Sequence, residues 1–143
     1  MATSNAATNY LERRIIHYII KNNSLSFSSP GDSLYVGLAT AVSAAETGSL
    51  TEANFTNYVR KQVVAANWTT IGADSTDTQT AKNSANVEYP ASGGTNNTIS
   101  HVFVADASTG GNILFVGALD VSKLIADGDI FRINAGNLTI ELK

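Results

Sequence analysis

Apolar residues are densest in residues 99–121, which read ISHVFVADASTGGNILFVGALDV. At the start of this block both alternating sets of positions are largely apolar, and a strand with two apolar faces belongs inside a sandwich or at a packed interface. Residues 108–112 (STGGN) accept the positive φ angles of a hairpin connection at little steric cost. Residues 113–119 are apolar again. The pattern therefore predicts a β-hairpin with no reactive side chain placed to use it.

A helical period marks residues 9–21, NYLERRIIHYIIK. Asn9 and Glu12 have the spacing of a capping box, which predicts where the helix begins. The apolar residues form one broad face, made up of Leu11, Ile15, Ile16, Tyr18, Ile19 and Ile20. A helix with so broad an apolar face must pack against another protein surface. We expect it to lie on the chain's own sheet, and the alternative is docking onto a neighbouring subunit.

Shorter apolar runs predict further strands, at residues 33–40, 58–66, 86–89, 130–133 and 138–142. The last two are expected to pair as a closing hairpin, after a tight turn at Asp127-Gly128-Asp129. Residues 41–57 lack strand periodicity and are interpreted as a long excursion, with a short helical turn capped at Ser49. Residues 73–84 are interpreted as a polar loop.

These elements together predict a mainly β protein. Its expected fold is a single antiparallel β-sandwich or barrel of about seven strands with an N-terminal α-helix. A chain of 143 residues fits one domain, residues 1–143, with the N-terminal segment and helix in residues 1–23 and the β-domain in residues 33–143. The sequence contains no convincing internal repeat and no coiled-coil heptads.

Composition narrows the classes of partner. Charged residues make up 15% of the chain and the net charge is −3, so we expect no nucleic acid, which binds clustered Lys and Arg. The basic doublets Arg13-Arg14 and Arg60-Lys61 are interpreted as solvated faces. Residues 1–8 lack the features of a signal peptide, and the apolar stretch of the helix is too short for a bilayer. We therefore expect a soluble protein made in a cytoplasm, with no membrane partner.

A search for catalytic or metal-binding chemistry finds no constellation. Cysteine is absent, and neither His17 nor His101 has a second ligand-type residue at metal-binding spacing. The chain has no Gly-x-Ser-x-Gly elbow, and no paired glycines followed by the Lys-Ser or Lys-Thr of a phosphate loop. Asp74 and Asp77 resemble part of a calcium loop that lacks its central Gly and final Glu. We expect no enzyme activity, no metal and no cofactor.

Five segments, taken in order, carry a family resemblance. NYLERRIIHYII resembles a YLEN-x-hydrophobic-L opening, SLYVGLAT an LYVGLFT strand, and FTNYVRKQVV a GYARV-x-V strand. ISHVFVADASTGGNILFVGAL is similar to VTHFGIFDAATGGNLLFYGAL, the most specific of the five, and FRINAGNLTIELK resembles F-x-AGALTITL. These are motifs of a family of small tailed-bacteriophage virion structural proteins, often labelled tail fibre proteins.

The resemblance implies a non-enzymatic structural protein of the virion, made in the cytoplasm of a host bacterium. A fibre shaft needs repeats, a coiled coil or a β-helix, which this sequence lacks. The leading hypothesis is therefore a capsid decoration or cement protein on the head exterior. Its partners would be the major capsid protein or other virion subunits, and a homo-oligomer, with a trimer favoured, would suit a local threefold axis.

Two alternatives follow from the same residues. The first is a tail, baseplate or tail-fibre-attachment protein of the same kind of particle. The second is a carbohydrate-binding module, with stacking faces supplied by Tyr35, Tyr58, Trp68 and Tyr89, although core or rim packing is the commoner use of such aromatics.

Candidate contact residues come from the helix and from the long excursion after the first strand. On the helix they are Tyr10, Arg13, Arg14 and His17, and in the excursion they are Asn54 and Phe55. Both segments depart from the family's pattern, in the doublet Arg13-Arg14 and in the greater length of residues 41–57. Interaction specificity usually resides in such loops. We also expect the N-terminal segment to be fixed against a neighbouring subunit.

Overall fold

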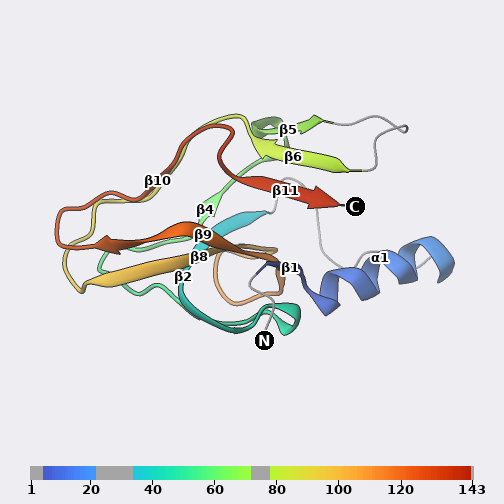
Figure 1. Cartoon of the computed structure of the whole chain (residues 1–143), viewed down its shortest axis with the longest axis horizontal. Helices are drawn as coiled ribbons and strands as arrows, with labels where there is room; N and C mark the ends of the chain where they lie inside the picture. The colour runs from blue at the N-terminus through green and yellow to red at the C-terminus, as the bar shows by residue number, and fades with distance from the viewer. Residues whose placement is uncertain (1–4, 22–33, 72–77, 143) are drawn as a thin grey trace.

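The computed structural model describes residues 5–21, 34–71 and 78–142 (Figure 1). In chain order their elements are β1 (Ala6–Ala7), α1 (Asn9–Lys21), β2 (Tyr35–Ala44), the 3₁₀ turn η1 (Ala45–Thr47), β3 (Ser49–Glu52), β4 (Lys61–Gln62), the 3₁₀ turn η2 (Ala65–Asn67), β5 (Trp68–Ile71), β6 (Gln79–Asn83), β7 (Val87–Glu88), β8 (Asn97–Ala105), β9 (Ile113–Ile125), β10 (Arg132–Ile133) and β11 (Thr139–Leu142). Strands dominate the described residues, which confirms the predicted mainly β class with an N-terminal helix.

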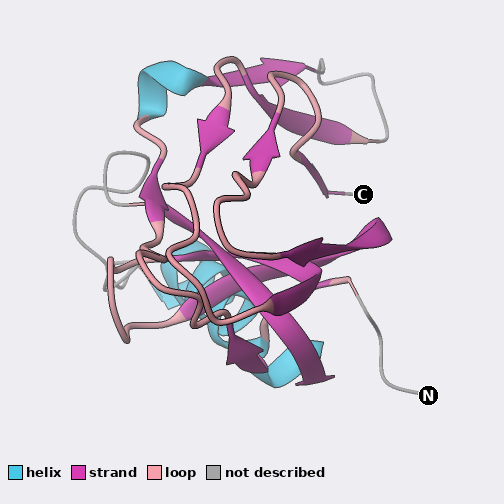
Figure 2. Ribbon diagram, turned by 90° about the vertical axis from the view of Figure 1, so that its left-hand side faces the viewer, coloured by secondary structure: helices cyan, strands magenta, loops and turns pink. Residues whose placement is uncertain are grey.

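The strands form three antiparallel sheets. The largest has the order β1-β9-β8-β2-β3, with β4 also paired to β2. The two smaller sheets, β11-β6-β5 and β10-β7, lie beside it (Figure 2). This arrangement is consistent with the predicted antiparallel sandwich or barrel, although many of its strands are only two to five residues long.

The main core lies between the largest sheet and the smaller ones. Its fully buried side chains include Val36 and Ile99 from the largest sheet and Val87 from β7, together with Tyr89. A second, smaller cluster lies on the other face of the largest sheet and consists of Ala39, Ala45, Phe103, Ala105 and Val116. β8 contributes to both clusters, since Val104 belongs to the first and its neighbours to the second. The prediction of a strand buried on both faces is confirmed.

The predicted central hairpin is also confirmed. β8 pairs with β9, and Val104 lies opposite Phe115. Gly110 and Gly111 have φ angles of 59° and 69°, the left-handed conformation that glycine adopts without strain. Farther along the pair, β9 passes from Ala118 to Lys123 while β8 passes only from His101 to Ile99. This bulge leaves residues 119–122 without direct partners in β8.

Residues 41–57 were wrongly predicted as an excursion with a helical turn. They contain the end of β2 and all of β3, which pair as an antiparallel hairpin. The pairing register shifts twice, between Ala39 and Ala41 and again between Val42 and Ala44. Each shift interrupts the alternation of apolar and polar positions, so the sequence shows no strand period there.

Two further segments differ from their predicted structure. The predicted strand at residues 58–66 is limited to the two residues of β4, followed by η2. The predicted polar loop at residues 73–84 contains β6, whereas residues 72–77 lie outside the described residues. β6 is polar because it is the central strand of a small, largely exposed sheet, where ladder hydrogen bonds rather than apolar burial hold it.

The predicted closing hairpin does not form. β10 pairs with β7 and β11 pairs with β6, so the two strands belong to different sheets. Asn83, a buried side chain, fixes the crossing: its Oδ1 accepts from the Leu138 amide at 2.8 Å and its Nδ2 donates to the Asn134 carbonyl at 3.0 Å. The tight turn before β10 is as predicted, with Gly128 at a φ of 84°.

α1 begins and ends where the sequence predicts, but its cap is Thr8 rather than Asn9. The Thr8 carbonyl accepts from the Glu12 amide at 3.1 Å, and its Oγ1 accepts from the Leu11 amide at 3.4 Å. Thr8 is buried against the start of β9. Its hydroxyl donates to the Ile113 carbonyl and its amide to the Leu114 carbonyl. None of the helices in the described part of the chain has the length and hydrophobicity needed to cross a membrane.

Gly37 in β2 allows a close contact that an alanine would prevent. Gly37 lies opposite Phe103, and a Cβ built on it would lie 2.1 Å from the Phe103 ring. A Cβ built on Gly117, in β9, would meet no other atom within 4 Å. We expect Gly37→Ala to destabilise the fold by about 1–3 kcal/mol through overpacking, and Gly117→Ala to leave stability unchanged or slightly raised. Urea unfolding of both variants checks this, and equal stabilities would contradict the contact.

Candidate interaction site

The candidate site is the outer face of α1, which the chain's own sheets do not cover. Only Leu11 is buried on this helix. Ile16, Ile19 and Ile20 are 60%, 68% and 70% exposed. α1 meets the largest sheet and η1 at its first turns and then projects away from the strands (Figure 1). The expectation that the helix is covered by its own sheet is therefore wrong for most of its length.

The exposed isoleucines form a single stripe. They lie at positions i, i+3 and i+4, which are neighbours on a helix surface. Leu11 lies roughly 130° around the helix from the centre of this stripe at 100° per residue, so the buried and exposed apolar residues belong to two faces. The single broad apolar face that the sequence indicated is thus divided, with one part on the domain and the other in solvent.

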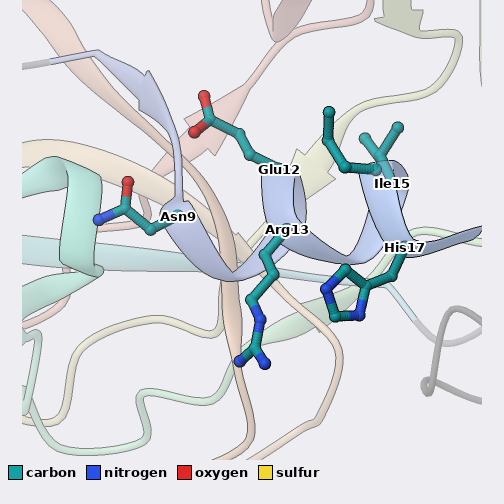
Figure 3. Close-up of a pocket in the computed structure, with 6 residues that line it drawn as sticks. Asn9, Glu12, Arg13, Ile15 and His17 are labelled. Carbon is teal, nitrogen blue, oxygen red and sulfur yellow. The ribbon is translucent and has the colours of Figure 1, made fainter. Parts of the chain in front are cut away.

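Of the predicted contact residues of α1, Arg13 and His17 lie to one side of this stripe, and Tyr10 and Arg14 lie on the far side of the helix. Arg13 and His17 project to one side of the helix and Glu12 and Ile15 to the other (Figure 3). They border a shallow, open depression of about 620 Å³ together with Asn9 and Ile16. The Arg14 guanidinium stacks over the Tyr10 ring at 5.1 Å, a cation–π contact that fixes both side chains.

The two predicted contacts from residues 41–57 have different outcomes. Phe55 is only 2% exposed and packs edge-on against Tyr58 at 5.3 Å, so its assignment as a surface contact is wrong. Burial in the core stabilises an aromatic ring more than exposure to solvent does. Asn54 is exposed, and its Oδ1 accepts a hydrogen bond from Nδ2 of Asn97 at 2.9 Å. Because Asn97 lies opposite Ile125, Asn54 and α1 are at opposite ends of β9.

The aromatic residues considered for sugar stacking are mainly structural. Tyr89 is 2% exposed, stacks on Tyr58 at 6.1 Å and donates its hydroxyl hydrogen to the Val36 carbonyl at 2.8 Å. Burial raises the pKa of both tyrosines. Trp68 packs on the rim of the core, as predicted. The structure therefore does not present these side chains as one platform for a sugar ring.

Arg60, predicted to be solvated, instead joins three segments through its guanidinium. It donates to both carboxylate oxygens of Glu52 at 2.8 Å and to the carbonyls of Ala107 and Gly110 at 2.8 Å. It also stacks over the Phe103 ring at 5.0 Å. The hydrogen bonds to Glu52 raise the pKa of Arg60. No local sequence pattern identifies this contact, because its partners lie in three separate segments.

The described residues give little support for a metal-binding or catalytic site. Among residues 5–21, 34–71 and 78–142, no three His, Cys, Asp or Glu side chains gather where they could hold a metal ion. His101 has a lowered pKa because it is partly buried, and its Nδ1 lies 2.8 Å from the Ser100 hydroxyl. That hydroxyl also donates to the Thr40 carbonyl at 3.0 Å, within the sheet. These contacts serve the pairing of β8 with β2.

We expect Glu52→Gln to destabilise the fold by about 3 kcal/mol, because it takes the carboxylate away from a nearly buried guanidinium. Arg60→Met should cost about 2 kcal/mol, because the Glu52 side chain that it leaves behind is 31% exposed. The double variant should lose less than the sum of the two. Arg132→Met removes an ion pair to Glu88 whose side chains are about half exposed, and should cost less than about 1 kcal/mol. Urea unfolding measures all four. An Arg60 variant no less stable than the Arg132 variant would contradict the assignment.

Comparison with known proteins places these features in a family. No curated protein matches the chain. The family model described as "Podophage GP4 fiber I protein gp80" matches residues 6–141, from β1 nearly to the end of β11. This match includes α1 and the central hairpin, and it agrees with the resemblance to tailed-phage virion proteins. The chain therefore belongs to this family of phage virion structural proteins.

Proposed function

We propose that this chain is a non-catalytic subunit of the phage tail-fibre apparatus that docks onto another virion subunit through α1. The observation that carries the proposal is the stripe of three isoleucines on α1, each at least 60% exposed. The family's description as a fibre protein supports the placement in the tail. The absence of a catalytic motif from the sequence supports the mechanical role.

The stripe carries enough apolar area to contribute usefully to docking. Fully burying an isoleucine contributes about 1.5–3 kcal/mol, so covering three that are already one-third buried contributes roughly 3–6 kcal/mol. A single such contact is weak once the entropy of association is subtracted. Several copies that dock together on one particle gain the effective concentration of a multivalent assembly.

Capsid decoration, the leading hypothesis from sequence, is the second candidate. The observation that favours it is that the sequence contains neither repeats nor heptads from which a fibre shaft could be built. In that case the domain would cover the head and α1 would dock onto capsid subunits. The two placements differ in the number of copies per particle.

We expect purified virions to contain this chain at a few per cent of the copies of the major capsid protein. A tail fibre is present in few copies, whereas a decoration protein follows the symmetry of the lattice. Quantitative mass spectrometry of purified particles makes the measurement. A ratio near one to one, or a simple lattice fraction, would replace the tail placement with capsid decoration, and absence from the particle would contradict both.

We expect Arg13→Glu with Arg14→Glu to reduce attachment to particles by at least about tenfold while leaving the domain folded, because the change reverses the charge of α1 and Arg13 lies next to the stripe. Circular dichroism verifies folding, and the amount of each variant incorporated into particles that assemble with the variant in place of the natural chain measures attachment. A matched control is Lys61→Glu with Arg132→Glu, which changes the net charge equally at positions outside α1. Equal attachment of both variants would contradict α1 as the docking element.

A further inference from the structure

A second uncovered apolar feature lies between the largest sheet and β11. It is a groove of about 690 Å³, a volume within the range of ordinary binding pockets. Its walls are the β1–β9–β8 side of the largest sheet and the strand β11, which form the lower and upper sheets of Figure 2. Its apolar lining includes Val102, Phe115, Leu119, Leu138 and Ile140.

The lining of this groove is incompletely buried. Val102, Phe115 and Leu119 pack against the main core but remain partly exposed, as does Ile140 on the opposite wall. β11 is the outer strand of its own sheet. Among the described residues, residues 5–8 cover the outer edge of β9 from Ile113 to Ala118, and the rest of that edge is open. The sandwich is therefore open on this side, with apolar side chains on both walls.

The charges of the groove and of α1 are opposite. Asp120 and Glu141 are the charged residues that line the groove, and both are acidic. α1 carries Arg13, Arg14 and Lys21 against a single acidic residue, Glu12. Next to the stripe itself lie Glu12 and Arg13, whereas Arg14 and Lys21 lie farther around the helix. The helix as a whole therefore carries two more basic than acidic residues, and the groove is lined by two acidic ones.

We propose that the groove binds α1 of a second copy of this chain, with Ile16, Ile19 and Ile20 between its walls. The proposal rests on the docking role of α1 and names its partner. No α1 residue lines the groove in the part of the chain that the structure describes. β1 lies at the groove's rim, and from there α1 extends away from the strands (Figure 1). In this proposal the helix that binds in each groove therefore comes from a neighbouring copy.

Each copy offers one helix and one groove, so every copy both donates and receives. Two copies can exchange helices about a twofold axis, and three or more can pass them head-to-tail. A head-to-tail contact closes into a ring when its rotation divides a full turn, and otherwise continues as a filament. A reciprocal dimer is the smallest closed form in which each α1 and each groove has a partner, and a trimer is the smallest head-to-tail ring.

The experiment mixes two defective forms of the full chain. The first, Ile16→Glu with Ile20→Glu, places charges on the apolar stripe of α1 and leaves the groove unchanged. The second, Asp120→Lys with Glu141→Lys, reverses the charge of the groove and leaves α1 unchanged. Light scattering after size-exclusion chromatography should show an oligomer for the wild type, a monomer for each variant alone, and a one-to-one dimer for the mixture. Self-association of each variant should be at least about tenfold weaker than that of the wild type.

The outcomes separate this inference from the docking role itself. Val59→Glu changes an exposed apolar residue outside both surfaces and should leave the oligomer intact. A monomeric wild type, or a mixture that stays monomeric, would overturn the inference. If α1 variants nevertheless lost attachment to particles, the docking role would stand with a different partner.

An engineered disulfide distinguishes a neighbour's helix from the chain's own. The chain contains no cysteine, so Ile16→Cys and Leu119→Cys are the only thiols present. Under mild oxidation the double variant should form a crosslinked oligomer on a non-reducing gel. A crosslink confined to single chains would show that α1 folds back into its own groove and would overturn the inference.

Discussion

The contact between Arg60 and Glu52 holds together parts of the chain that local structure alone would leave separate. Glu52 ends β3, Arg60 precedes β4, and the carbonyls that Arg60 binds belong to the connection between β8 and β9. The guanidinium is nearly buried, with a side-chain exposure of 6%. A buried cation is tolerated only when its hydrogen bonds are satisfied, and here four acceptor atoms surround it. The hairpin connection therefore has one geometry.

Tyr58 extends this contact into the main core. Its hydroxyl donates to Glu52 at 2.8 Å and accepts from the Leu38 amide at 2.9 Å, while its ring packs between Phe55 and Tyr89. On the other face of the largest sheet, Arg60 covers Phe103, whose ring occupies the space above Gly37. The two core clusters thus meet at one polar network, and a change in either is transmitted to the hairpin.

The sequence predicted those elements whose formation depends on local pattern. The helix has a strong period of its own, and the central hairpin has apolar strands around a glycine pair, so their positions could be predicted well. The pairing of β10 with β7 and of β11 with β6 could not, because partners distant in sequence are selected by the closing of the core and by the side chain of Asn83. The irregular pairing of β2 with β3 erased the period on which a prediction relies.

The sequence was enough to predict which apolar residues the candidate site contains. It was not enough to predict which of their side chains are exposed to solvent. The apolar residues of α1 are evident from the sequence, but only the structure shows that Leu11 faces the domain while Ile16 faces solvent. Phe55 illustrates the opposite error, since an apolar residue between polar ones can belong to the core. Arg60 was misassigned for a related reason: a basic doublet has the same appearance whether its side chains meet water or a distant carboxylate.

The attachment of α1 determines how a pull on this domain would be carried. The contact of the N-terminal segment with a neighbour stays a prediction, and residues 5–8 bind the chain's own β9 through Asn5, β1 and Thr8. Tension on α1 therefore enters at Thr8 and passes directly into β9 and its long antiparallel partner β8. The load is shared by the most extensively paired strands rather than by a peripheral loop. A pull on the docked helix would therefore be resisted by the hydrogen-bonded length of β8 and β9.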